Sequence, residues 1–288
     1  MNTMPIRDVS LFVKIMGQGY PLVLMHGGPG LDHSTLSSLE PLADRFTLIF
    51  YDHRCNGRST GAGPSMTWDN LTADADALRE TLGFDQWAVL GHSFGGCVAL
   101  EYALRYRERV SHLLLLDTCG DHWWAQHNAP MILAKRGYRA ATVAAARRFY
   151  NGELTPREVR PILSRFFGAY FYRFGLRALP HAVRAGFRLK VRPEAHVFAF
   201  KHLLNGWTVM DRLNDIDVPT LVLAGRHDFL FPPEHQAILA DRLPHAQLEI
   251  IERAGHSAHA EQAAEVIAVM KRFMARAATP VRELEEAR

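Results

Sequence analysis

The stretch from Gln86 to Tyr106, QWAVLGHSFGGCVALEYALRY, decides the fold. It opens with the apolar run Trp87–Leu90 and closes with apolar residues repeated at helical spacing. Between these parts stands Gly91-His92-Ser93-Phe94-Gly95, in which a glycine lies two residues from the serine on either side. A strand, a sharp turn and a helix are the context in which a G-x-S-x-G serine stands clear of a sheet as a nucleophile. The stretch therefore predicts a reactive serine, Ser93, at the end of a buried strand.

Short apolar runs recur on both sides of this stretch, with helical segments between them. Continuous apolar runs of this length are typical of parallel strands that are covered on both faces. Their alternation with helices predicts the α/β class, with a mostly parallel sheet flanked by helices. We expect buried strands at Pro21–Met25, Phe46–Asp52, Gln86–Gly91, His112–Asp117, Pro219–Gly225 and Gln247–Ile251, helices at Thr67–Leu82, Gly95–Tyr106, Pro233–Leu243 and Ala260–Arg276, and an antiparallel lead-in strand at Val9–Ile15.

The alternation stops after Asp117 and resumes near Val218. Between these points the sequence has helix signals without strand signals. Thr155, Pro156 and Glu158 form one such helix start, with a capping threonine, a proline at the first position and a glutamate that closes a capping box. We therefore expect a sheet core at 1–120 and 211–288 and an inserted helical cap, or lid, at 121–210.

The composition of the 288-residue chain is that of an ordinary globular protein. With 48% hydrophobic and 22% charged residues, it excludes a disordered, collagen-like or coiled-coil chain. The net charge of +3 is unevenly distributed, because the expected cap holds 15 Lys and Arg against 4 Asp and Glu. The cap also holds 15 of the 29 aromatic residues, in dense patches such as Phe166–Phe174. Such patches are more typical of an apolar lining than of a base-stacking platform, so we expect no nucleic-acid partner.

Other features limit the partners and the compartment. Three cysteines without a C-x-x-C motif are typical of a reducing cytoplasm, and the first residues lack the pattern of a signal peptide. No apolar run reaches the roughly 20 residues of a membrane span, so we expect no membrane partner. Histidine and cysteine spacings fit no metal site, and the expected chemistry needs no cofactor. A small-molecule substrate is the expected partner, and a homodimer through an apolar cap face stays open.

A serine nucleophile needs a histidine base and an acid that orients the base. In this architecture the chain order is serine, acid, histidine. Asp228 follows the apolar run that ends in Gly225, and His256 follows the next expected strand, so we assign them as acid and base. Asp117 also ends a strand and is the alternative acid. His92 is expected to pack or to form a hydrogen bond rather than to act as the base.

The oxyanion of the transition state needs hydrogen-bond donors. One expected donor is the backbone N–H of Phe94, which directly follows the nucleophile. The other is expected from the turn His26-Gly27-Gly28-Pro29-Gly30 after the strand at Pro21–Met25. Glycines let backbone amides approach a substrate without a Cβ in the way, and we choose Gly28 as the second donor.

Together these motifs resemble the α/β-hydrolase superfamily over nearly the whole chain. HGGPG at His26–Gly30 resembles the oxyanion loop of the proline iminopeptidase branch, and Asp52–Ser59 resembles its D-x-R-G-x-G-x-S motif, with Cys55 in place of glycine. GRHD at Gly225–Asp228 resembles the acid loop of that branch. Iminopeptidases usually carry G-G-S-W-G at the nucleophile, whereas GHSFGG here resembles the members that hydrolyse esters and lactones.

We therefore predict a serine hydrolase that cleaves a small carboxylic ester or lactone through an acyl-enzyme. An aminopeptidase must hold an ammonium group with carboxylates, and the basic cap offers few of them. Release of N-terminal proline nevertheless stays an alternative, as do a C–C bond hydrolase and a non-catalytic receptor on the same fold. Aromatic cap residues are the expected substrate contacts, chiefly Trp123, Trp124, Phe167 and Tyr170.

Overall fold

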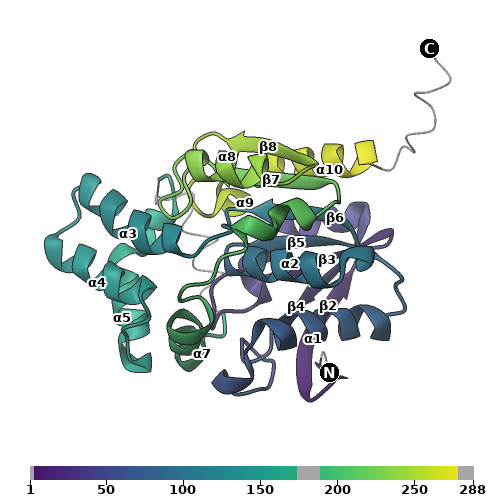
Figure 1. Cartoon of the computed structure of the whole chain (residues 1–288), viewed down its shortest axis with the longest axis horizontal. Coiled ribbons are helices and arrows are strands. Elements are labelled where there is room, and N and C mark those ends of the chain that lie inside the picture. Colours follow the sequence, from purple (N-terminus) through teal and green to yellow (C-terminus); the bar gives the residue numbers. More distant parts are fainter. Residues whose placement is uncertain (1–2, 174–188, 278–288) are drawn as a thin grey trace, which may run out of the picture.

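The computed structural model describes residues 3–173 and 189–277, and its centre is one eight-stranded sheet (Figure 1). The strand order is β1-β2-β4-β3-β5-β6-β7-β8. β1 and β2 join the sheet antiparallel, and every other neighbouring pair is parallel. The strands are β1 (Thr3–Ile6), β2 (Val9–Met16), β3 (Tyr20–Met25), β4 (Phe46–Tyr51), β5 (Trp87–His92), β6 (Val110–Leu116), β7 (Thr220–Gly225) and β8 (Ala246–Ile251).

The predicted α/β class and mostly parallel sheet are confirmed, including the antiparallel lead-in strand. The apolar runs form strands because they lie between two helical layers. All six residues of β5 and of β7 are buried. Burial of such side chains contributes about 25 cal/mol for each Å² of apolar surface removed from water. The sequence analysis missed β1, whose mixed residues show no alternation.

Two layers of helices cover the sheet. α1 (Trp68–Thr81), α2 (Phe94–Arg105) and α8 (Pro233–Asp241) pack on one face, and η1 (His33–Asp44), α9 (Ala258–Glu261) and α10 (Ala263–Ala277) pack on the other. The single helix expected at Ala260–Arg276 is wrong, because the chain leaves helical geometry at Gln262 and begins a second helix there. Short 3-10 turns lie at η2 (Gly63–Ser65), η3 (Arg107–Arg109) and η6 (Met210–Asp215).

Between β6 and β7 the chain forms a set of helices beside the sheet, drawn in teal and green at the left of Figure 1. Thr155 and Glu158 begin one of them as predicted, because Glu158 Oε2 accepts from the Thr155 N–H at 2.9 Å. None of the helices in the described part of the chain is long and apolar enough to span a bilayer. The elements of this insertion are α3 (Trp123–Lys135), α4 (Ala140–Tyr150), α5 (Pro156–Phe166), η4 (Phe167–Tyr170), α7 (Pro193–Phe198) and η5 (Ala199–Leu203).

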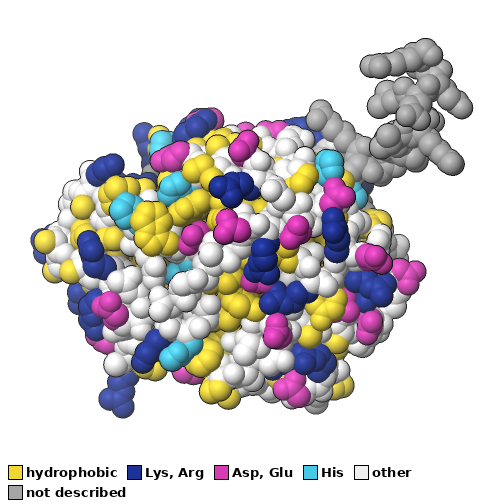
Figure 2. All heavy atoms as spheres, viewed as in Figure 1, with side chains coloured by type: hydrophobic (Ala, Val, Ile, Leu, Met, Phe, Trp, Pro, Cys, Tyr) yellow, Lys and Arg dark blue, Asp and Glu magenta, His cyan; other side chains and the backbone are white. Residues whose placement is uncertain are grey.

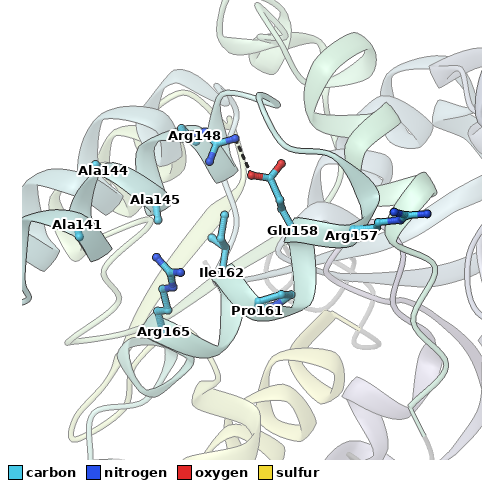
Figure 3. A pocket seen from close by; sticks show the side chains of 9 residues that line it. All are labelled: Ala141, Ala144, Ala145, Arg148, Arg157, Glu158, Pro161, Ile162 and Arg165. Carbon is cyan, nitrogen blue, oxygen red and sulfur yellow. Dashed lines mark hydrogen bonds and ion pairs between the residues drawn. The ribbon is translucent and has the colours of Figure 1, made fainter.

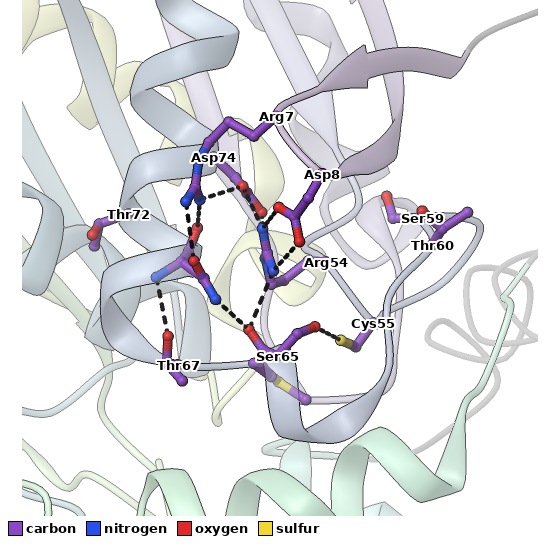
Figure 4. A network of polar contacts seen from close by, with 12 residues as sticks. Arg7, Asp8, Arg54, Cys55, Ser59, Thr60, Ser65, Thr67, Thr72 and Asp74 are labelled. Atoms are coloured by element: carbon purple, nitrogen blue, oxygen red, sulfur yellow. Dashed lines mark hydrogen bonds and ion pairs between the residues drawn. The ribbon is translucent and has the colours of Figure 1, made fainter.

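A buried ion pair fastens the loop after β4 to α1 (Figure 4). The fully buried guanidinium of Arg54 donates to both carboxylate oxygens of Asp74, at 2.6 and 2.7 Å, and to Asp8 at 2.8 Å. Arg7 also reaches Asp74, at 2.9 Å. This loop supports the turn after β3, so the network bears on the site described next.

Candidate active site

Ser93 lies at the junction of β5 and α2 in a strained backbone conformation, with φ 52° and ψ −120°. The flanking glycines make that turn sterically possible. A Cβ at Gly95 would come within 2.0 Å of the Met25 carbonyl oxygen, and one at Gly91 within 2.4 Å of the Gly95 carbonyl oxygen. Glycine is therefore required on both sides of the serine, as the motif predicts.

The structure brings Ser93, His256 and Asp228 together in one hydrogen-bonded chain. Ser93 Oγ lies 2.9 Å from His256 Nε2, and His256 Nδ1 lies 2.9 Å from Asp228 Oδ2. Because a carboxylate can only accept, Nδ1 carries the proton and Nε2 is free to accept from the serine hydroxyl. The second oxygen of Asp228 accepts from the Leu230 N–H at 2.8 Å, which fixes the carboxylate plane.

Asp117, the alternative acid, lies at the end of β6 and does not bond to His256. Its oxygens accept from the Gly225 N–H at 2.7 Å and the Ala258 N–H at 3.2 Å. It therefore bridges the loops that carry Asp228 and His256. Burial, reinforced by the charge of Asp228, raises the pKa of Asp117 to about 8. Burial alone would lower the pKa of His256, but the Asp228 carboxylate outweighs it, so that this pKa lies above 6.5.

His92 and His259 pack on each other near His256, with ring centroids 4.4 Å apart. His92 Nε2 lies 3.0 Å from the His256 carbonyl oxygen, and His259 Nε2 lies 3.0 Å from the Thr35 carbonyl oxygen. The prediction that His92 forms a hydrogen bond away from the serine is thus in line with this geometry. Among the described residues, one group has ligand atoms close enough to share a metal ion. It consists of His92, His259 and Asp117, whose ligand atoms lie within 4.8 Å of one another. All three side chains already hold backbone groups.

The glycine-rich turn after β3 lies against the nucleophile. A Cβ at Gly27 would come within 3.0 Å of the Cβ of Ser93. Gly28 has φ +63°, and its carbonyl accepts from the Leu31 N–H at 2.8 Å. Within the described residues, neither the Gly28 N–H nor the Phe94 N–H has a hydrogen-bond acceptor. Neither N–H group is thus engaged by another described group, and their role as oxyanion donors stays a prediction.

Aromatic rings surround the catalytic histidine. Tyr170 contacts the His256 ring edge-on at 5.4 Å between centroids, and Phe231 lies 5.6 Å from it. The hydroxyl groups of Tyr150 and Tyr170 lie 2.7 Å apart, and Phe229 packs on Tyr170 at 5.0 Å. Sequence analysis missed Phe229 and Phe231, although their position directly after Asp228 could have indicated them.

Of the four cap aromatics expected to contact substrate, Tyr170 contacts His256, and Phe167 packs on Tyr170 at 6.2 Å between ring centroids. Trp123 is 55% exposed and stacks on His127, and Trp124 stacks on His235 at 4.4 Å. Phe167 is 37% exposed. Successive helical residues point about 100° apart, so the density of aromatics in the sequence does not say which rings face the site, and the contacts of these four rings with substrate stay a prediction.

None of the four carboxylates of the cap forms a hydrogen bond with a triad residue. Asp121 accepts from the Trp123 N–H at 2.8 Å, and Glu153 and Glu194 are exposed. Glu158 is held by the Thr155 amide and then by Arg148, which lower its pKa to about 2. Residues 174–188 contain no Asp or Glu, so these four are all the carboxylates that the cap can offer to an ammonium group.

A groove of about 480 Å³ lies between α4 and α5, with no triad residue in its lining (Figure 3). Figure 3 shows Arg148 and Glu158 paired across one end, and Arg165 reaching up from α5 on the side of α4. Lys and Arg side chains lie scattered among apolar ones over the cap at the left of Figure 2, and the arginines of α4 and α5 are exposed. Most cap arginines therefore lie on the surface rather than beside Ser93.

Comparisons with known proteins agree with this geometry. The family model described as "alpha/beta hydrolase fold" matches residues 20–263. A proline iminopeptidase of Neisseria meningitidis is 30% identical over 273 residues, which cover 83% of this chain and 84% of the relative. Proline iminopeptidase PfmaB of Pestalotiopsis fici is 28% identical, with 89% and 93% covered. A thermophilic esterase from Thermogutta terrifontis superimposes with a TM-score of 0.76 at 25% identity, covering 97% of this chain and 98% of that chain.

Proposed function

Because the chain belongs to the α/β-hydrolase fold family, in its branch of proline iminopeptidases and esterases, we propose that it hydrolyses small carboxylic esters or lactones through an acyl-enzyme. The observation that carries the proposal is the continuous hydrogen-bonded chain from Ser93 Oγ through His256 to Asp228, with 2.9 Å at each step. That arrangement is what a serine needs to become a nucleophile.

In the first half-reaction, the Ser93 hydroxyl attacks the carbonyl carbon of the substrate while His256 Nε2 takes its proton. Asp228 holds the ring in the Nδ1–H tautomer and stabilises the imidazolium that forms. The backbone N–H groups of Phe94 and Gly28 are placed to stabilise the oxyanion of the tetrahedral intermediate. The imidazolium then gives its proton to the departing alkoxide, which leaves an acyl group on Ser93.

In the second half-reaction, His256 takes a proton from water, which attacks the acyl-enzyme through the same oxyanion site. The carboxylic acid is released, and Ser93 recovers its proton from the imidazolium. Since the base must be neutral at the start of each half-reaction, activity should fall as the pH drops through the pKa of His256, which lies above 6.5.

The surroundings of His256 favour an uncharged, partly apolar substrate. Tyr170 and Phe231 flank the ring, and the Tyr150–Tyr170 hydroxyl pair supplies a single polar point. Apolar surroundings with few polar groups are typical of a site for a small organic molecule. No cap carboxylate is placed to bind an ammonium group, which weighs against a free N-terminal amine.

Release of N-terminal proline is the second candidate, and the names of the relatives favour it. It would require an ammonium site from the core. The core carboxylates near the triad are engaged, because Asp117 accepts from two backbone amides and Glu261 accepts from the Gly255 N–H at 2.7 Å and the Tyr172 N–H at 2.9 Å. This arrangement ranks the ester or lactone reaction first.

A substrate panel separates these reactions. p-Nitrophenyl esters, aliphatic lactones and prolyl p-nitroanilide are tested on wild type, on Ser93→Ala and on Ser164→Ala, a control at an exposed serine of α5. The proposal expects ester or lactone turnover that is lost only in Ser93→Ala. Preferential cleavage of the prolyl amide with a free amine would establish the second candidate. Absence of turnover, together with failure of a fluorophosphonate to label Ser93, would indicate a receptor.

A further inference from the structure

His26 lies directly before the oxyanion turn, and both of its ring nitrogens are engaged. Its Nε2 accepts from the His53 backbone N–H at 3.2 Å, and its Nδ1 lies 3.0 Å from the Gly27 carbonyl oxygen. A backbone N–H can only donate, so Nε2 has no proton and Nδ1 carries it. The ring is fully buried, and burial lowers the pKa of His26, which keeps it neutral. The Nδ1–H group therefore donates to the Gly27 carbonyl.

This hydrogen bond fixes the plane of the peptide that joins Gly27 to Gly28. The bond is trans, since the described chain contains no cis peptide. In a planar trans peptide the C=O and the N–H point in opposite directions. With the Gly27 oxygen held toward the His26 ring, the Gly28 N–H is turned to the opposite side. The left-handed conformation of Gly28, with φ +63°, lets the chain continue from a peptide in this orientation.

The loop after β4 holds the other end of this arrangement. It supplies the His53 N–H, and its Asn56 side chain accepts from the Gly30 N–H. The same loop is fastened to α1 by the buried Arg54–Asp74 pair (Figure 4). The turn after β3 is thus held by a second, anchored loop, so it does not have to order itself when substrate binds.

We propose that His26 is a positioning residue, which orients the 27–28 peptide so that the Gly28 N–H points at the oxyanion formed on Ser93. The inference rests on the proposed serine-hydrolase function. His26 does not touch the substrate, since its two nitrogens are occupied by protein backbone. His26 acts through one rigid peptide, because the Gly27 oxygen that it holds and the Gly28 N–H that would face the oxyanion lie on opposite edges of the same plane.

The test compares His26→Leu, which keeps a branched apolar side chain but no donor, with His26→Asn, whose carboxamide N–H can replace Nδ1–H. Loss of one oxyanion donor commonly lowers kcat by about 10²–10³-fold, and a misdirected donor should cost about 10–100-fold. We expect that loss in His26→Leu, with KM changed less than about twofold. His26→Asn should recover most of the rate. His112→Leu, a histidine at the start of β6 outside the site, should behave as wild type.

The affinity of a trifluoromethyl ketone that resembles the best substrate gives a second readout, which a general loosening of the fold would not change. Its adduct with Ser93 carries an oxyanion, so its affinity should fall by the same factor as kcat/KM in His26→Leu. The pH at which activity falls should not move, because His256 is untouched. Equal ketone affinity in wild type and His26→Leu would overturn the inference. A rise in KM together with a fall in kcat, neither of which His26→Asn restores, would also overturn it.

A measurement on the wild type covers the case in which His26→Leu does not fold. The ¹⁵N chemical shifts of the histidine rings report the tautomer, with His26 identified from the spectrum of His26→Asn. A neutral ring protonated at Nδ1 supports the inference, and one protonated at Nε2 overturns it. Wild-type protein that turns over nothing in the panel would refute the proposed function itself. Wild type that is active while His26→Leu is equally active would refute this inference alone.

Discussion

Asp117 follows β6 and Asp228 follows β7, and replacing each by asparagine decides which of them is the catalytic acid. Both oxygens of Asp228 accept, one from the Leu230 N–H at 2.8 Å and one from His256 Nδ1 at 2.9 Å. Asparagine has one oxygen, so one of these contacts would bring two N–H groups face to face. If its amide faces His256, the ring takes the other tautomer and Nε2 can no longer accept from the serine.

The size of the effect follows from that tautomer. Amidation of a triad acid in this way lowers kcat by roughly 10⁴-fold, equivalent to about 5.5 kcal/mol at 1.36 kcal/mol per tenfold. Asp117 accepts only from backbone amides, at 2.7 and 3.2 Å. Its replacement leaves one buried N–H unsatisfied, which costs about 1–3 kcal/mol of stability. We expect kcat of Asp117→Asn to remain within about tenfold of wild type, because Asp117 forms no hydrogen bond with the imidazole.

The assay is a pH series of kcat and KM on the best ester of the panel, with urea unfolding of each variant alongside. Wild type should lose activity as the pH falls through the pKa of His256, which is above 6.5. In Asp117→Asn that pKa should change little, because burial raises the pKa of Asp117 itself to about 8 and leaves it mostly uncharged in this range. Near-wild-type kcat in Asp228→Asn, with a collapse in folded Asp117→Asn, would refute the assignment and make Asp117 the acid.

Three further predictions concern stability, each measured by urea unfolding. Asp74→Asn should lower the free energy of unfolding by about 3–5 kcal/mol, because it leaves the buried Arg54 charge poorly compensated. Asp69→Asn, on the same helix but 87% exposed, should lower it by less than about 1 kcal/mol. Equal losses in the two variants would contradict this. Ser93→Gly should be more stable than Ser93→Ala by about 1 kcal/mol, since only glycine relieves φ 52°, and the reverse order would show that the turn is unstrained. Because the pKa of Asp117 is raised from its ordinary value of 3.8 to about 8, Asp117 contributes stability that is fully present below pH 3.8 and is lost as the pH rises through about 8. The stability of wild type relative to Asp117→Asn should therefore fall between these pH values. A constant difference would contradict this.

The core of the fold could be predicted because its signals are local. Each parallel strand is a short apolar run, and each of Ser93, Asp228 and His256 follows such a run within a few residues. Carboxyl ends of parallel strands meet at one edge of the sheet, so these residues had to lie near one another. The break at Gln262 was not predictable in this way, since the apolar spacing continues through it.

The rest of the site depends on contacts between distant segments. Nothing in the spacing of His26 and His53 indicates that the ring of one accepts from the amide of the other, because the contact exists only once β3 and β4 are paired. The cap shows the same limit. Its aromatic richness predicted an apolar lining, but Tyr150 and Tyr170 meet at the site while Trp123 faces solvent, and only helix orientation distinguishes them.

Strain and function coincide at the ends of β5 and β6. The two strands are paired up to His92 and Leu116, and the next residues, Ser93 and Asp117, both have left-handed φ values, 52° and 45°. The two turns hold each other, because the Ser93 N–H donates to the Leu116 carbonyl at 3.0 Å and Thr118 Oγ1 donates to the Ser93 carbonyl at 2.6 Å. Non-glycine residues in this conformation cost on the order of 1–3 kcal/mol each and persist only where surrounding structure determines them. Here the buried strands on both sides provide that structure, so the sheet itself holds Ser93 and the loops of His256 and Asp228 in fixed relative positions.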